Sequence, residues 1–174
     1  MKEYKSGRFT FIPSDLELLK SELESNQSLS SRLRAFVFES WPPGEYDRNA
    51  IEYFIEKLRL KGPAAEGWLG WYVLAETDSG KRDLIAAAGF FGPPDEEGSV
   101  EIGYSIVEEW RGKGAATEIV EFLVKTAFGY EYVNLIKART SKDNAASIKV
   151  LQKNGFFLSG SGEEPDSLIF HLKK

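Results

Sequence analysis

The chain contains no cysteine and a single histidine, and both scarcities narrow its chemistry. Without cysteine it has no disulfide, no thiolate nucleophile and no cysteine-based zinc site. The one histidine, His171, lies three residues from the C-terminus in an alternating apolar segment. We therefore expect neither Ser-His catalysis nor a metal site.

Long apolar runs and a net positive charge are also missing. The longest apolar stretches, such as 85–88 and 156–158, are far shorter than the roughly 20 residues that cross a bilayer. Residues 1–7 carry charge but no apolar segment follows them, so we expect neither a secretory signal nor a lipidation site. These features predict a cytoplasmic protein without a membrane segment. The formal charge of -5 opposes binding to nucleic acid and mildly favours cationic partners such as amines.

What the chain does have is enough apolar material for one substantial core. It is 174 residues long, 42% hydrophobic, and contains 12 Phe, 7 Tyr and 4 Trp. No linker rich in Gly, Ser or Pro divides it. We therefore expect a single domain spanning residues 1–174.

The first part of the chain alternates one strand with amphipathic helices, as its hydrophobic spacing and capping residues indicate. The predicted segments are a strand at 9–12, a helix opened by the capping box 14–17, a short helix opened by Ser28 or Ser31 and running through 33–37, an irregular exposed loop at 41–44, and a helix opened by Asp47 and closed by Gly62-Pro63.

From residue 68 onward the pattern changes to strands and then to alternating helices and strands. The predicted segments are an antiparallel meander of strands at 68–75, 84–91 and 99–107, a helix at 112–128, a strand at 133–140, a helix at 144–154 closed by Gly155, and a hairpin that joins 156–158 to 167–172 through 160–162. This order predicts a mixed α/β domain.

The sharpest functional signal is Gly112-x-Gly114, between a strand and a long helix. Glycines let the backbone approach an anion, and the free N–H groups at a helix start point at it. The spacing does not fit a Walker loop, and a dinucleotide fingerprint would need a third glycine where Thr117 stands. An isolated G-x-G is also common in empty tight turns, so the flanking residues have to decide.

Three segments resemble the GNAT superfamily of N-acetyltransferases, and in particular its branch of ribosomal-protein N-terminal acetyltransferases. Segment 111–116 matches the [QR]-x-x-G-x-[GA] signature, with Arg111 at its first position. Segment 100–106 is similar to the fourth strand of the family, and segment 144–156 resembles its N-x-x-[AS] to G-F region. The resemblance covers about residues 84–158.

The resemblance implies a mostly antiparallel seven-stranded sheet, flanked by helices, whose fourth and fifth strands splay apart. Acetyl-CoA would lie in that gap, with its pyrophosphate on the helix start and its pantetheine along the exposed strand edge. The implied cofactor-binding residues are Ser105, Ile106 and Val107 on the edge, then Arg111, Gly112, Lys113, Gly114, Ala115 and Ala116 in the loop, and Asn144 at the next helix cap.

The implied reaction is direct attack of a primary amine on the acetyl group. Near neutral pH an alkyl amine is mostly protonated, so a base or a water chain must remove a proton. Glu101 stands where many family members carry this base, although an outward strand residue would look the same. A backbone N–H of Ile106 or Val107 would receive the charge that develops on the carbonyl oxygen.

The usual acid of the family is missing. Many relatives place a tyrosine where this chain has Leu151. In the ribosomal-protein branch the serine of N-x-x-S is proposed for this role, and Ser147 occupies that position. A serine near a helix cap is also common without any catalytic role. Tyr104 is a further candidate.

Acceptor recognition is expected from the early helices and the final hairpin. Trp41, Glu45 and Tyr46 combine aromatic surface with negative charge, which suits an ammonium group. The same residues could equally form an aromatic plug over the core. The acceptor is either a protein N-terminal α-amine or a small molecule of the polyamine or aminoglycoside kind. A non-catalytic acyl-CoA-binding domain and a homodimer both stay open.

Overall fold

The apolar alternation of the chain builds one nine-stranded sheet, ordered β1-β2-β4-β5-β6-β7-β9-β8, with β3 paired beside β5. The computed structural model describes residues 1–174, apart from the side chains of residues 63 and 64. All strand pairs are antiparallel except β3 with β5 and β6 with β7. The strands are β1 Tyr4–Ser6, β2 Phe9–Pro13, β3 Phe36–Val37, β4 Gly70–Glu76, β5 Arg82–Phe90, β6 Ser99–Ile106, β7 Leu135–Ser141, β8 Phe157–Ser161 and β9 Ser167–Lys173.

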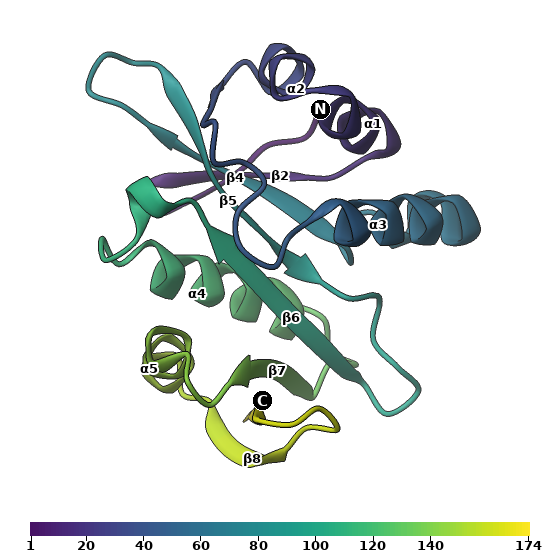
Figure 1. Cartoon of the computed structure of the whole chain (residues 1–174). Helices are drawn as coiled ribbons and strands as arrows, with labels where there is room; N and C mark the ends of the chain where they lie inside the picture. The colour runs from purple at the N-terminus through teal and green to yellow at the C-terminus, as the bar shows by residue number, and fades with distance from the viewer.

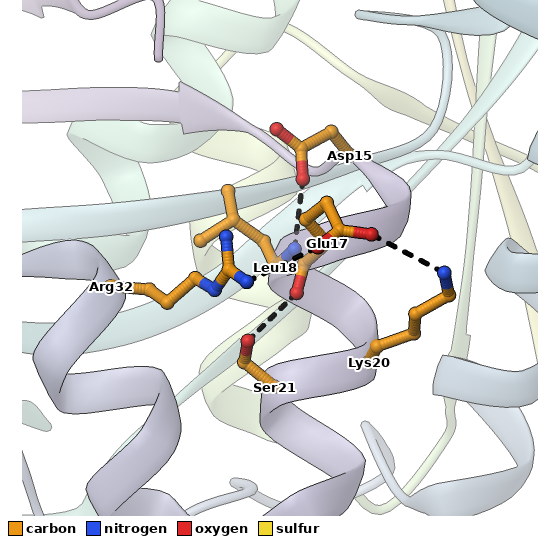
Figure 2. Close-up of polar contacts among 6 residues, drawn as sticks. All are labelled: Asp15, Glu17, Leu18, Lys20, Ser21 and Arg32. Atoms are coloured by element: carbon orange, nitrogen blue, oxygen red, sulfur yellow. Dashed lines mark hydrogen bonds and ion pairs between the residues drawn. The ribbon is translucent and has the colours of Figure 1, made fainter.

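Five α-helices flank the sheet, and side-chain caps explain where four of them begin. The helices are α1 Leu16–Glu24, α2 Asn26–Leu33, α3 Arg48–Lys61, α4 Ala115–Phe128 and α5 Ala145–Lys153. The caps are Asp15, Ser25, Asp47 and Asn144, each of which accepts a hydrogen bond from a backbone N–H of the first turn. Figure 2 shows this for α1, where Asp15 accepts from the N–H of Leu18. Such a cap stabilises a helix by about 1 kcal/mol.

The helices cover both faces of the sheet (Figure 1). Adjacent residues of β4 show the two layers, because successive side chains of a strand point to opposite faces. Tyr72 points toward α1 and donates to Glu22, whereas the Trp71 ring meets Phe122 of α4 edge-on, with centroids 5.3 Å apart. On the α4 side Phe122 also stacks on the buried Phe11 of β2. The core is therefore two layers divided by the sheet.

The parallel contact between β6 and β7 is short. It joins residues 99–102 to 135–138 and stops there, although β6 continues to Ile106 and β7 to Ser141. Beyond residue 102 the β7-facing edge of β6 is unpaired. This register is compatible with the predicted splaying of these two strands.

The structure confirms the meander and the helix that Asp47 opens, and it corrects several details. The short helix predicted through 33–37 is wrong, because α2 ends at Leu33 and Arg34 adopts a left-handed φ of 51°. Residues 36–37 then pair with β5 as β3. The sheet has nine strands where seven were predicted, because β1 and β3 are too short to show an alternating pattern.

Three further boundaries differ. The helix expected from residue 112 begins at Ala115, because two glycines with positive φ precede it. In the last hairpin β8 extends to Ser161, so the turn begins at Gly162, the last residue of the predicted 160–162 segment. None of the helices in the described part of the chain is long and apolar enough to cross a membrane.

Candidate active site

The start of α4 is shaped for an anion. Gly112 and Gly114 have φ values of 71° and 78°, a left-handed conformation that favours glycine. Unlike the other four α-helices, α4 has no side chain bonded to its N-terminal N–H groups. The first N–H groups of a helix have no partner inside the helix and carry its positive dipole end. This loop therefore offers backbone donors to a phosphate.

A residue far away in the sequence braces this loop. The Arg8 guanidinium, in the turn between β1 and β2, donates to the carbonyl of Lys113 at 2.6 Å and pairs with Glu118 at 2.9 Å. The ammonium of Lys113 lies 5.2 Å from the centre of the Trp110 ring. Arg8 thus holds the carbonyl side of the loop.

The backbone of β6 uses its two edges alternately. Val107 donates to Ile85 at 3.0 Å, and Phe91 donates to the carbonyl of Glu101 at 3.1 Å. Because bonds to one antiparallel neighbour occur at every second residue, the backbone of 101, 103, 105 and 107 faces β5. The backbone of 104 and 106 faces the unpaired edge.

This alternation corrects the expectation for the strand edge. Among the three predicted edge residues, Ile106 presents its N–H to the open side, and Ser105 and Val107 present theirs to β5. The N–H of Val107 is taken by Ile85 and is not free for a substrate oxygen. Arg111 donates from Nε to the carbonyl of Ile106 at 3.3 Å.

Two hydroxyl groups meet between β6 and α5. The cap residue Asn144 accepts a hydrogen bond from the N–H of Ser147, and the Ser147 hydroxyl lies 2.9 Å from the Tyr104 hydroxyl. Burial raises the pKa of Tyr104 above its ordinary value, and the hydrogen bond to Ser147 partly opposes this. Leu151, in the family's tyrosine position, is fully buried and offers no proton. From the sequence, Ser147 and Tyr104 were separate candidates for the acid, and the fold brings their hydroxyl groups together.

An apolar cavity of about 280 Å³ lies on the face of the sheet opposite to the Tyr104–Ser147 hydroxyl pair. Its floor is the backbone and small side chains of residues 87–89 in β5. Both neighbours of this floor, β4 and β6, also line the cavity. Its remaining walls include Glu45 and Tyr46 on the loop before α3, Phe54 on α3, Tyr72 on β4, Phe91 after β5 and Ser105 on β6. We call this cavity the aromatic pocket.

The structure separates the three predicted acceptor residues. Glu45 and Tyr46 line the aromatic pocket. Trp41 does not, and it is not part of an exposed turn as expected, because only 5% of its surface is accessible and its indole N–H donates to Glu22 at 2.6 Å. Trp41 therefore lies in the core beside the pocket.

Glu22 is the residue that sequence reasoning missed. It is 7% exposed and accepts three hydrogen bonds, from Trp41 at one oxygen and from Tyr46 and Tyr72 at the other. Burial raises the pKa of its carboxyl group, and the three hydrogen bonds partly oppose this. Its signal in the sequence is a carboxylate one turn after Leu18 and on the same apolar face of the helix.

Glu101 points to the same face of β6 as Ser105 but does not line the aromatic pocket. It lines a separate cavity of about 180 Å³, with Lys137 among its neighbours. Phe91 lines both cavities. The Glu101 carboxylate pairs with Nε of Arg139 at 3.2 Å.

Comparison with known proteins decides the family. A family model described as the Acetyltransferase (GNAT) domain matches residues 10–157. The chain belongs to the GNAT acetyltransferase family. Over 169 residues it is 30% identical to the uncharacterized N-acetyltransferase YjdG of Bacillus subtilis, and the match covers 97% of this chain and 98% of YjdG.

Solved structures show that this GNAT acetyltransferase shares its fold with enzymes of different substrates. The ribosomal alpha-N-protein acetyltransferase RimL, solved with coenzyme A, matches with a TM-score of 0.68 at 15% identity, covering 99% of this chain and 98% of RimL. A chimera of the spermidine N-acetyltransferase SpeG from Vibrio cholerae matches with a TM-score of 0.65 at 16% identity, covering 96% of each chain. These likenesses concern the fold.

Proposed function

We propose that this GNAT acetyltransferase moves the acetyl group of acetyl-CoA to a primary amine held in the aromatic pocket. One observation carries the proposal: residues 104–106 of β6 belong to both halves of the site. The backbone of Tyr104 and Ile106 forms the unpaired edge next to the anion loop, and Tyr104 and Ser105 also line the pocket. An acyl donor along the edge and an amine in the pocket would therefore meet at this strand.

The residues present fit acetyl-CoA. The N–H groups of the loop Arg111–Ala116 would bind its pyrophosphate, and the guanidinium of Arg111 and the ammonium of Lys113 would add positive charge. The open backbone at Ile106 and the amide of Asn144 would bind the pantetheine arm. When bound, acetyl-CoA supplies an acetyl group activated as a thioester.

The hydroxyl pair and the open strand edge have proposed roles in the reaction. The Ile106 N–H would stabilise negative charge on the acetyl oxygen. Ser147, connected to Tyr104, would supply a proton to the departing sulfur. Hydroxyls at 2.9 Å can pass a proton from one to the other, so Tyr104 would replenish Ser147.

Glu101 is the base that the family resemblance implies. Its carboxylate pairs with Arg139, and Phe91 lines both its cavity and the aromatic pocket, so Glu101 has no direct contact with the pocket. In this route a water chain would carry the proton from the amine to Glu101.

The acceptor class that we propose is a protein N-terminal α-amine. A cavity of about 280 Å³ holds a side chain rather than a folded ligand, and the exposed Glu45 at its rim would attract the ammonium. The RimL likeness favours this class, whereas the SpeG likeness supports a small polyamine as the second candidate. Either acceptor would be available in the cytoplasm.

The first experiment measures thiol release from acetyl-CoA against N-terminal peptides, polyamines and aminoglycosides. Turnover with peptides supports the proposed acceptor. Turnover confined to polyamines or aminoglycosides would mean that the acceptor is a small amine. Tight binding of acetyl-CoA without thiol release for any amine would contradict the proposal. Glu101→Gln and Ser147→Ala, measured with the active acceptor, then test the two assigned proton carriers.

A further inference from the structure

A second carboxylate lies beside the aromatic pocket, and the reaction described so far does not use it. The partners of Glu22 among the described side chains are three neutral donors, namely the indole of Trp41 and the hydroxyls of Tyr46 and Tyr72. It takes part in none of the ion pairs between described residues. A buried carboxylate without a cation is costly for a fold to keep, which raises the question of its use.

The sheet register connects Glu22 to the reacting strand. Tyr72 of β4 is paired with Ala87 of β5, and Ala87 is paired with Ser105 of β6. Neighbouring strands lie about 4.8 Å apart, so Tyr72 and Ser105 stand roughly 10 Å from each other on one face. The short side chain of Ala87 leaves the space between them to the pocket.

The loop before α3 closes the same space. Gly44 approaches β6 so closely that a Cβ built on it would lie 3.3 Å from the Ser105 hydroxyl. Two residues later, Tyr46 lines the pocket while its hydroxyl donates to Glu22 at 2.9 Å. One wall of the acceptor cavity is therefore hydrogen-bonded directly to the buried carboxylate.

We propose that Tyr46 and Glu22 form a proton relay for the acceptor amine, an inference that rests on the proposed function. The N–H bond of the ammonium breaks and its electron pair stays on nitrogen, ready to attack the acetyl carbon. The proton bonds to the Tyr46 oxygen while the original hydroxyl proton of Tyr46 passes to Oε2 of Glu22. No atom is oxidised or reduced. As the C–S bond breaks, the nitrogen loses its second proton to water, which balances the proton that the sulfur takes from Ser147. The first proton returns from Glu22 through Tyr46 to water.

The surroundings of the two residues suit these roles. Burial raises the pKa of Glu22, which makes its carboxylate a better proton acceptor than an exposed one. Burial and the neighbouring Glu22 raise the pKa of Tyr46 well above its usual value, so Tyr46 passes a proton on without first losing its own to solvent. Tyr72, at 1% exposure, and Trp41 hold the carboxylate in place.

The test compares Glu22→Gln, Tyr46→Phe and the double variant with the wild-type protein, using the acceptor that the amine panel identifies. General-base catalysis contributes about 10²-fold or more, so each single variant should lose about 10²-fold in kcat with KM within about twofold. Because both residues act on one proton, the double variant should be no slower than the slower single variant. Independent, multiplying losses would overturn the relay.

Matched controls lie close by. Glu17→Gln changes a carboxylate on the same helix, where Glu17 is exposed and pairs with Lys20 and Arg32 (Figure 2). Tyr53→Phe removes a hydroxyl on α3 that donates to the carbonyl of Phe91. Both controls should keep kcat within about twofold of the wild-type value.

A series of acceptor amines with falling pKa separates a relay from a packing defect. An amine that is already neutral at the assay pH needs no base, so the losses in Glu22→Gln and Tyr46→Phe should shrink along the series. A loss of equal size for every amine would mean that these residues only shape the pocket, and would overturn the proposal. If Glu22→Gln fails to fold, the series with Tyr46→Phe decides alone.

The outcome for the relay is distinct from the outcome for the proposed function. Wild-type turnover with unchanged rates in both single variants overturns the relay and leaves the acetyltransferase assignment standing. In that case Glu101→Gln should show the large loss in kcat. Absence of wild-type turnover with every amine overturns both.

Discussion

Replacing Gly114 with alanine tests whether the start of α4 binds a phosphate. Gly114 has φ 78° and ψ -2°, a left-handed conformation that costs a residue with a Cβ about 1–2 kcal/mol. A Cβ at this position would meet only Nη2 of Arg8, at an ordinary contact distance of 3.9 Å. We expect Gly114→Ala to fold, with a melting temperature lowered by about 2–8 °C.

The effect on ligand binding should be larger than the strain alone suggests. The N–H groups around Gly114 are the ones that side-chain capping leaves free. A hydrogen bond to a charged group contributes about 1.5–3 kcal/mol, so displacing a phosphate from one or two of them removes about 3 kcal/mol. Since 1.4 kcal/mol corresponds to a factor of ten, the Kd for CoA should rise about 10²-fold.

Titration calorimetry with CoA measures this effect, and Gly80→Ala provides the control. Gly80, in the β4–β5 turn, has a nearly equal φ of 74° and nothing within 4 Å of a built Cβ. Gly80→Ala should therefore lose similar stability and keep the wild-type affinity for CoA. If Gly114→Ala binds CoA as tightly as Gly80→Ala does, the anion loop has been assigned incorrectly.

Three further predictions concern stability. Gly89→Ala should unfold the protein or cost more than about 3 kcal/mol in a urea melt, because its Cβ would lie 2.2 Å from the Leu69 carbonyl oxygen; a normal melt would contradict this. Phe11→Ala should cost about 3–5 kcal/mol, since Phe11 is fully buried against Phe122. Burial raises the folded-state pKa of Glu22 above its ordinary 4.5, so its contribution to stability is present below about pH 4.5 and is lost as the pH rises through the folded value. Urea melts between pH 4 and 7 should show this loss in the wild type and not in Glu22→Gln.

Local signals in the sequence predicted much of this fold. The capping aspartate at 47 and the glycine at 62 fixed both ends of α3, because a cap acts on N–H groups within three residues of itself. The strand alternation predicted the meander in the same way. The loop at 111–116 could be predicted because its signal, two glycines directly before a helix start, lies within a few neighbouring residues. The identity of the acetyl donor, acetyl-CoA, came from the family resemblance.

The parts that could not be predicted depend on contacts between distant residues. Arg8 braces the loop from 105 positions away, and no local pattern links it to Lys113. Trp41 looked exposed because it precedes two prolines, yet its indole is drawn inward by Glu22, 19 positions earlier. Only the packing of α1 on the sheet brings that carboxylate to the tyrosines. The residues of the proposed relay come from distant segments, so no short sequence motif could have indicated it.

The register of β6 is what makes one strand serve two substrates. Its side chains alternate, so Tyr104 reaches α5 while Ser105 faces the aromatic pocket, and the backbone of Tyr104 and Ile106 faces the open edge. A slip of one residue would exchange these directions and place each group on the wrong face. The turn before β6 resists such a slip, because Oδ1 of Asp95 accepts the N–H groups of both Glu97 and Ser99. A short turn outside the aromatic pocket thus fixes the geometry that the reaction requires.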